Sequence, residues 1–165
     1  MYYVLGYGAL TDPITMLGRC PSAVYKGIGT LDDHELYIDR CSSVRPAIGS
    51  VTMGVVWKIN NKDMTALDGY EGYPYLYQRK EVDVNIDNRL VRVWVYYYDI
   101  DFKNIGEPAS DKYYKTCKKG YRVFGLPFDK QFGAAQKKCK KKFTLPKVWV
   151  TKQKHTKKKK VFNKY

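Results

Sequence analysis

The chain has 165 residues, of which 44% are hydrophobic and 16 are tyrosines, and this composition excludes a mainly disordered protein. Its formal net charge is +14, but 14 lysines and one acid lie between Asp129 and the end, whereas residues 1–128 hold 16 Lys and Arg against 15 Asp and Glu. We therefore predict one domain over residues 1–143, nearly neutral up to residue 128 and long enough to bury a core, and a lysine-rich tail over residues 144–165.

The first part of the chain predicts short strands and one short helix. Residues 2–7 are rich in strand-forming side chains, and Gly8 ends this strand. A helix should follow, because Thr11 or Asp12 can cap it and Pro13 suits its first position. Further strands are predicted for AVYKGIGTL, HELYIDR and SVTMGVVWKI.

The second part predicts a hairpin between helices. Asn60 or Asn61 can cap the helix KDMTALDG, and Gly69 lies near its end. YLYQRKEVDVNI and LVRVWVYYYDI alternate in polarity and are joined by the turn DNR, which is typical of a hairpin. Two helices follow, one capped by Ser110 and one that Pro127 opens and that runs through FDKQFGAAQKKCKKK. The elements show no βαβ rhythm, so we predict an α+β fold with a mixed, mainly antiparallel sheet or barrel and helices outside it.

The cysteines and the N-terminal sequence indicate in which cellular compartment the protein is expected. The four cysteines are widely separated and form no CxxC pair: Cys20, Cys41, Cys117 and Cys139. His34 and His155 lie in unrelated sequence contexts, so we do not predict a metal site. We expect the cysteines to be reduced and mostly buried. The start MYYVLGYGAL has no basic stretch, and its apolar run is too short to span a bilayer. We therefore expect a cytoplasmic protein without a membrane span.

Three segments occur in an order and spacing that resemble one enzyme family. They are YGALTDPITMLGRCPSA, MGVVWKINNKDMTALDGYEGYPYLYQRKEV and SDKYYKTCKKGYRVFGLP. Together they resemble the gamma-glutamyl cyclotransferase family over residues 3–138. The resemblance implies a compact mixed barrel and an enzyme that cyclises the glutamyl head of a γ-glutamyl compound to 5-oxoproline, with release of an amine. It also implies a small-molecule γ-glutamyl substrate and no metal or organic cofactor.

Glu71, in the sequence LDGYEGYP, matches the position of the family's catalytic glutamate. The substrate's α-amine attacks its own γ-carbonyl, so one carboxylate that removes a proton and passes it to the leaving amine is sufficient. Tyr70, Tyr73 and Leu67 can shield this carboxylate from water and raise its pKa towards neutrality. The alternative is a solvated turn residue, because an isolated acid in such a loop is more often exposed.

The segment GYGAL matches the family's substrate-binding loop, which is usually Tyr-Gly-Ser-Asn. The resemblance implies that its backbone N–H groups bind the glutamyl end of the substrate. The predicted binding residues are Gly6, Tyr7, Gly8, Ala9 and Leu10. Ala9 and Leu10 replace the usual Ser and Asn, which removes side-chain hydrogen bonds and leaves the backbone donors. The alternative is an ordinary strand end.

Tyr113 matches a tyrosine that lines the substrate pocket in the family, where a phenol can bind a carboxylate or a carbonyl. The alternative is a helical tyrosine that packs on the sheet, and the neighbouring Tyr114 leaves the assignment open by one residue. Tyr77 and Arg79 are interpreted as supports of the loop around Glu71, with Arg79 pairing with an acid on a neighbouring strand.

The C-terminal part of the chain contains the lysine runs KKCKKK, just before the tail, and KQKHTKKKK, within it. Clustered lysines can contact the phosphates of nucleic acid or an anionic surface, although a solvated tail without a partner is the commoner meaning of such runs. Two other functions therefore stay open beside the enzyme. One is a protein that binds a small anionic ligand without turnover, and the other is a nucleic-acid-associated protein that acts through its tail.

Overall fold

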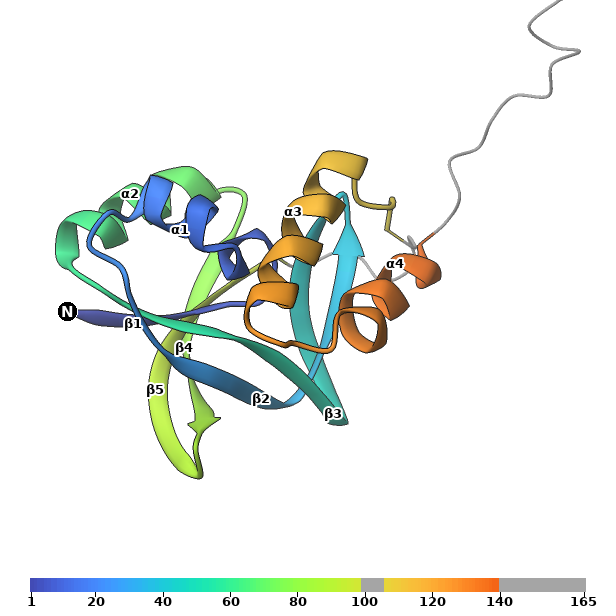
Figure 1. The fold of residues 1–165 in the computed structure, drawn as a ribbon, viewed down its shortest axis with the longest axis horizontal. Helices are drawn as coiled ribbons and strands as arrows, with labels where there is room; N and C mark the ends of the chain where they lie inside the picture. The colour runs from blue at the N-terminus through green and yellow to red at the C-terminus, as the bar shows by residue number, and fades with distance from the viewer. Residues whose placement is uncertain (99–105, 140–165) are drawn as a thin grey trace, which may run out of the picture.

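Five strands form a closed barrel in the computed structural model, which describes residues 1–98 and 106–139 (Figure 1). The order around the barrel is β1-β3-β2-β4-β5. The strands are β1 (Tyr2–Gly6), β2 (Val24–Asp39), β3 (Cys41–Ile59), β4 (Gln78–Ile86) and β5 (Arg89–Tyr97). All neighbouring strands are antiparallel except β1 and β5, whose parallel pairing closes the barrel. The predicted mixed, mainly antiparallel barrel with flanking helices is confirmed.

The strands β2 and β3 are longer than the sequence predicted. β2 joins AVYKGIGTL and HELYIDR into one continuous strand. The residues between them stay paired with β3, apart from a shift in the pairing register at Asp33, which has a φ of 52°. β3 begins at Cys41 and not at Ser50, although it contains Pro46 and Gly49. The two strands therefore extend beyond the barrel as a long ribbon, and the start of β3 reaches the candidate site.

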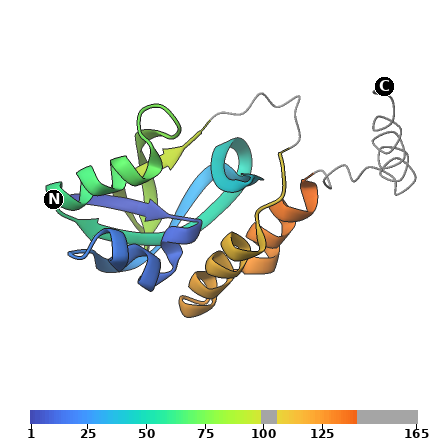
Figure 2. The same cartoon turned by 90° about the horizontal axis from the view of Figure 1, so that it is seen from above.

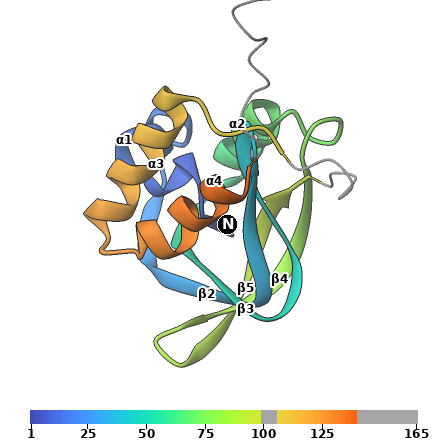
Figure 3. The same cartoon turned by 90° about the vertical axis from the view of Figure 1, so that its right-hand side faces the viewer.

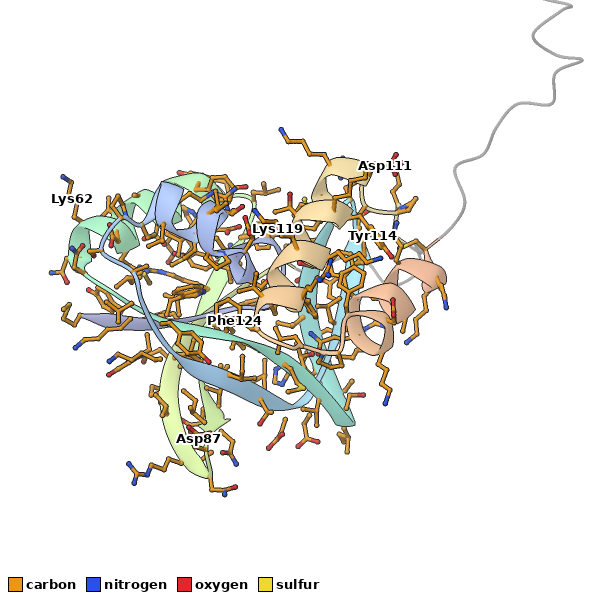
Figure 4. All side chains as sticks on the ribbon, viewed as in Figure 1. Lys62, Asp87, Asp111, Tyr114, Lys119 and Phe124 are labelled. Carbon is orange, nitrogen blue, oxygen red and sulfur yellow. The ribbon has the colours of Figure 1, made fainter. Side chains whose placement is uncertain are left out.

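The strands β4 and β5 form the predicted hairpin. Its turn consists of Asp87 and Asn88, whose φ values are 48° and 63°. Two positive φ values are typical of a two-residue hairpin turn, because the twist of such a turn matches that of the two strands. The tip, marked by Asp87 in Figure 4, projects away from the helices. β4 starts at Gln78 and not at Tyr75, and Leu76 and Tyr77, which precede it, line the candidate site.

The helices fall into two groups that cover different parts of the barrel. They are η1 (Ala9–Thr11), α1 (Pro13–Arg19), α2 (Asn61–Glu71), α3 (Asp111–Val123), the π-helix η2 (Asp129–Gly133) and α4 (Ala134–Lys138). α1 contacts α2, and both lie near one end of the barrel, whereas α3 and α4 lie side by side along the β2–β3 ribbon (Figures 1, 2 and 3). No helix within residues 1–98 and 106–139 is long and apolar enough to cross a membrane.

The predicted capping residues begin three of the helices. The side chain of Asp12 accepts a hydrogen bond from Thr15 N at 3.0 Å. Asn60 caps α2 in the same way, and Ser110 caps α3. The helix that Pro127 was expected to open through Lys142 ends at Lys138 in the described residues, and the domain boundary at residue 143 lies outside them. The division into domain and tail stays a prediction.

Aromatic side chains attach the end of α3 to the barrel and pack α3 against η2. Phe124, labelled in Figure 4, stacks on Tyr25 with the ring centroids 5.0 Å apart and meets Trp57 edge-on. Tyr114 of α3 packs against Phe128, which precedes η2, and against Phe132 within η2. The cysteines are free thiols, with Cys20 and Cys117 buried and Cys41 and Cys139 partly buried.

The helix α3 lies directly on the turn that follows β1. Tyr121 Oη donates a hydrogen bond to the carbonyl oxygen of Tyr7 at 2.7 Å. Gly120 faces the same turn, and a Cβ atom on it would overlap Thr11 and the backbone of Asp12. Only a glycine therefore allows this close approach of helix and turn.

We expect Gly120→Ala to destabilise the protein. Helix propensity favours alanine over glycine by about 1 kcal/mol, but displacing the turn should outweigh this and leave a net loss of about 1–3 kcal/mol. Gly69→Ala is the matched control, because Gly69 lies in α2 with no atom near its would-be Cβ. It should stabilise the protein. Urea unfolding measures both effects, and a midpoint for Gly120→Ala at or above that of the wild type would contradict the prediction.

Candidate active site

A cavity of about 210 Å³ lies where β1, β3, α2 and α3 meet. It is smaller than the ~300–1,000 Å³ of drug-sized pockets, so it suits a ligand of amino-acid size. Its wall contains all of the residues that the sequence predicted for the site: Gly6, Tyr7, Gly8, Ala9, Leu10, Glu71 and Tyr113. The other lining residues are Leu5, Arg19, Cys41, Ser42, Tyr70, Leu76, Tyr77 and Tyr96. The fold thus brings together segments that are up to about a hundred residues apart in the sequence.

Glu71 is the last residue of α2, and not part of the loop after it as the sequence suggested. The helix continues two residues past Gly69 and ends at Gly72, whose left-handed φ of 65° is typical of a helix C-cap. The side chain of Glu71 is partly buried and lines the cavity. Burial raises the pKa of Glu71 to about 7, against the opposing effect of the Arg19 charge. The carboxylate also lies at the negative end of the helix dipole, which further disfavours its charged form.

Of the three residues expected to shield Glu71, only Tyr70 lines the cavity with it. Leu67 is fully buried in the core, and the ring of Tyr73 faces Arg79, whose guanidinium carbon lies 4.8 Å from the ring centroid. The desolvation of the carboxylate therefore comes mainly from the enclosed shape of the cavity.

The turn of α2 that precedes Glu71 is fixed to the β4–β5 hairpin. Tyr96 Oη donates a hydrogen bond to Asp68 Oδ1 at 2.6 Å, and Arg79 Nη1 lies 3.3 Å from the same oxygen. The prediction that Arg79 pairs with an acid on a neighbouring strand is wrong, because α2 packs over the strand and presents Asp68 to it. This pairing holds the end of the helix, and so the backbone of Glu71, against the barrel.

The bend from Gly6 to Leu10 faces the cavity with its backbone. At Gly8, the hydroxyl groups of Ser42 and Tyr113 lie so close that a Cβ atom would collide with both. The first N–H groups of the 3₁₀ turn have no acceptor within the turn itself, so they are available to a ligand. The side chain of Leu10 is largely buried, and the cavity stays open beside it.

The wall opposite Glu71 contains neutral hydroxyl groups. The Oη of Tyr113 lies 2.8 Å from Ser42 Oγ and accepts a hydrogen bond from Ser42 N at 3.2 Å. Tyr77 Oη donates to the carbonyl oxygen of Ser42 at 2.9 Å, so Tyr77 is part of the site as well as a support of its loop. Burial raises the pKa of Tyr113 well above its ordinary value, which keeps the phenol protonated. Tyr114, the alternative to Tyr113, packs among phenylalanines and does not line the cavity.

Arg19 is the main charged residue of the site that sequence reasoning missed. It ends α1 and lines the cavity, with its guanidinium carbon 3.1 Å from the centroid of the Tyr70 ring. It occurs in GRCPSA, within a segment that carried the resemblance, so a signal existed. Ser42 had no such signal, because its place depends on the unexpected length of β3. In the described part of the chain, no group of three or more His, Cys, Asp and Glu side chains could hold a metal ion.

Comparison with known proteins agrees with this architecture. Residues 4–116 match the family model described as Gamma-glutamyl cyclotransferase, AIG2-like. The chain belongs to this family. A gamma-glutamylcyclotransferase of Bos taurus is 26% identical over 144 residues, which cover 79% of this chain and 74% of the bovine protein.

Two solved structures share the gamma-glutamyl cyclotransferase fold of this chain. One is a gamma-glutamyl cyclotransferase with a TM-score of 0.71 and 22% identity, covering 95% of this chain and 98% of that protein. The other is an uncharacterized protein from Homo sapiens, also with a TM-score of 0.71 and 22% identity, covering 88% of this chain and 91% of that one. The fold and family expected from the sequence are confirmed.

The raised pKa of Glu71 predicts a pH-dependent stability. A carboxyl group whose pKa rises on folding, here from 4.5 to about 7, stabilises the folded state fully below the lower value and loses this contribution as the pH rises through the higher one. Glu71→Gln cannot ionise, so it should be more stable than the wild type at pH 8, by roughly 1–2 kcal/mol after allowance for partial solvent contact. The two proteins should converge near pH 4, below the unfolded-state pKa. Urea unfolding at both pH values tests this, and a difference that does not change with pH would contradict it.

Proposed function

We propose that the protein is an active gamma-glutamyl cyclotransferase that converts a γ-glutamyl amine or amino acid to 5-oxoproline and the free amine. Glu71 acts as the general base and then as the general acid. The observation that carries this proposal is the partly buried carboxylate with a pKa of about 7, which shares a small cavity with the backbone bend around Gly8.

The reaction needs only one proton carrier. The α-ammonium group of the substrate gives a proton to Glu71, and the neutral amine then attacks the γ-carbonyl carbon to form the new C–N bond. Glu71 returns this proton to the leaving nitrogen and takes the second proton from the new ring nitrogen, so that the old C–N bond breaks and the lactam carbonyl forms again. The second proton then passes from Glu71 to the released amine, which departs as an ammonium. Because nucleophile and carbonyl are tethered, orientation alone can lower the barrier by about 7–11 kcal/mol. A base with a pKa near 7 is well matched to an α-amine, whose ordinary pKa is about 8.

The bend and its neighbours suit the glutamyl head of such a substrate. Successive N–H groups in a turn form a concave site for an anion, here the α-carboxylate of the head. The hydroxyl groups of Ser42 and Tyr113 lie beside Gly8 and can supply further hydrogen bonds. Ala9 and Leu10 leave the backbone donors unchanged, so their departure from the usual sequence is compatible with binding.

Detection of 5-oxoproline tests the proposal directly. The protein is incubated with γ-glutamyl amino acids, γ-glutamyl-lysine and glutathione, and the product is measured by mass spectrometry. Glu71→Gln should lower kcat by about 10²–10⁴-fold, because it removes the proton carrier. The control Glu81→Gln changes an exposed acid on β4 and should keep the wild-type rate. Full turnover by Glu71→Gln would refute the role of Glu71, whereas ligand binding without any product would support the binding-protein alternative.

The pH profile provides an independent test. Only the charged carboxylate can accept the substrate's proton, so kcat/KM should rise with pH and reach half of its plateau near pH 7. A rate that is already constant from pH 5 upwards would mean that the base is a group with an ordinary carboxyl pKa.

We infer a second, weaker activity for the lysine-rich part of the chain, namely non-specific contact with nucleic acid. Residues 106–139 contain eight Lys and Arg against three Asp and Glu, and residues 140–165, which include the tail, add eleven lysines without an acid. The helical layer in front of the tail is therefore itself basic. Truncation after Lys142 removes eight lysines, and it should weaken duplex DNA binding and flatten its dependence on salt. Unchanged affinity would exclude a role for the tail.

A further inference from the structure

The guanidinium of Arg19 contains one buried donor atom without a hydrogen-bond acceptor in the described part of the chain. Its Nη1 atom is buried and makes no hydrogen bond with the described residues, although the guanidinium stacks on Tyr70. A desolvated cationic donor without an acceptor is unfavourable by about 1–3 kcal/mol or more. Because Arg19 lines the cavity, a ligand in the cavity can supply the missing acceptor. A guanidinium binds a carboxylate with two parallel hydrogen bonds, which makes a carboxylate the best-fitting ligand group.

Arg19 and Glu71 face the same cavity without pairing with each other. No salt bridge joins them among the described residues, yet the charge of Arg19 lowers the pKa of Glu71. The two groups therefore interact electrostatically without a direct ion pair, and both line the same cavity. A ligand that carries both an amine for Glu71 and a carboxylate for Arg19 matches this arrangement.

The position of Arg19 indicates which carboxylate it binds. Tyr70, on which it stacks, is 52% exposed, whereas Ser42 beside the bend is 3% exposed. Arg19 thus lies towards the mouth of the cavity, and the bend lies on its enclosed side. Glu71 must reach the leaving nitrogen to return the proton, so the atoms bonded to that nitrogen lie beside Glu71 and point towards the mouth.

We infer that Arg19 binds the carboxylate of the leaving amino acid and so determines the specificity of the enzyme for the leaving group. This inference rests on the proposed cyclotransferase function. It assigns the head carboxylate to the bend and the second carboxylate, on the carbon next to the scissile amide nitrogen, to Arg19. A γ-glutamyl amine without that carboxylate leaves the guanidinium without its acceptor. An isopeptide of lysine places its carboxylate several bonds further from the nitrogen and should also bind less well.

A matched pair of substrates tests the assignment. γ-Glutamyl-alanine and γ-glutamyl-ethylamide have the same leaving skeleton and differ only in the carboxylate. Arg19→Gln should lower kcat/KM for γ-glutamyl-alanine by about 10- to 100-fold more than for the ethylamide, chiefly through KM. Arg19→Lys keeps the charge but loses the planar fork, so its effect should be intermediate. The control Arg122→Gln alters an exposed arginine of α3 and should leave the ratio of the two substrates at the wild-type value.

Two outcomes would overturn the assignment. An equal loss on both substrates would mean that Arg19 binds the head carboxylate or only supports the fold. Equal kcat/KM values of the wild-type enzyme for the two substrates would mean that no residue binds the carboxylate of the leaving group. If the wild type releases no 5-oxoproline at all, the proposed function fails instead, and calorimetric binding of the same two compounds to wild type and Arg19→Gln then decides the assignment by the same ratio.

Discussion

The site depends on the direct contact between α3 and the turn that follows β1. Gly120 brings the helix backbone against Thr11, and Tyr121 holds the carbonyl of Tyr7 by a hydrogen bond. From the barrel side, Trp57 Nε1 donates to the carbonyl of Leu10 at 2.9 Å. The carbonyls of Tyr7 and Leu10 are thus engaged by the protein, which fixes the bend beside the cavity. The same helix carries Tyr113, so one contact fixes both the bend and the hydroxyl groups above it.

Charged residues next to the site pair with one another, whereas Arg19 and Glu71 within it do not pair in the part of the chain that the structure describes. Asp68 receives both Arg79 and Tyr96, and Asp12 caps α1 and lies 3.5 Å from Lys119. These pairs hold the start of α1 and the last turn of α2 in place. The opposite end of α1 presents Arg19 and the last turn of α2 presents Glu71, two opposite charges that share a cavity and form no ion pair with each other among the described residues. Unpaired charges of this kind lower the stability of the folded state, and they are expected at a site where a bound ligand pairs with them.

Local chemistry explains which elements could be predicted from the sequence. Caps such as Asp12 and Ser110 act within one helical turn, and the hairpin turn at Asp87 needs only two residues. The length of β3 could not be predicted, because Pro46 and Gly49 disfavour a strand unless a long partner such as β2 pairs with it. The end of α2 was misjudged for a similar reason, since Gly69 is tolerated inside a helix whose opposite face is packed on the core.

The candidate site shows the same division between local and spatial information. Glu71 and the bend were predictable because each occurs in a short motif. Arg19 also lies in a motif segment, but only the fold shows that it lines the cavity, and Ser42 had no signal in the sequence at all. This difference also bears on Ala9 and Leu10. A bend that binds through its backbone depends on Gly8, where no side chain fits, and much less on the side chains that follow. Because the cavity wall is assembled from several segments, hydroxyl groups absent from the bend can be supplied from β3 and α3. Loss of Ser and Asn in the motif is therefore weak evidence against activity, whereas a side chain at position 8 would be strong evidence.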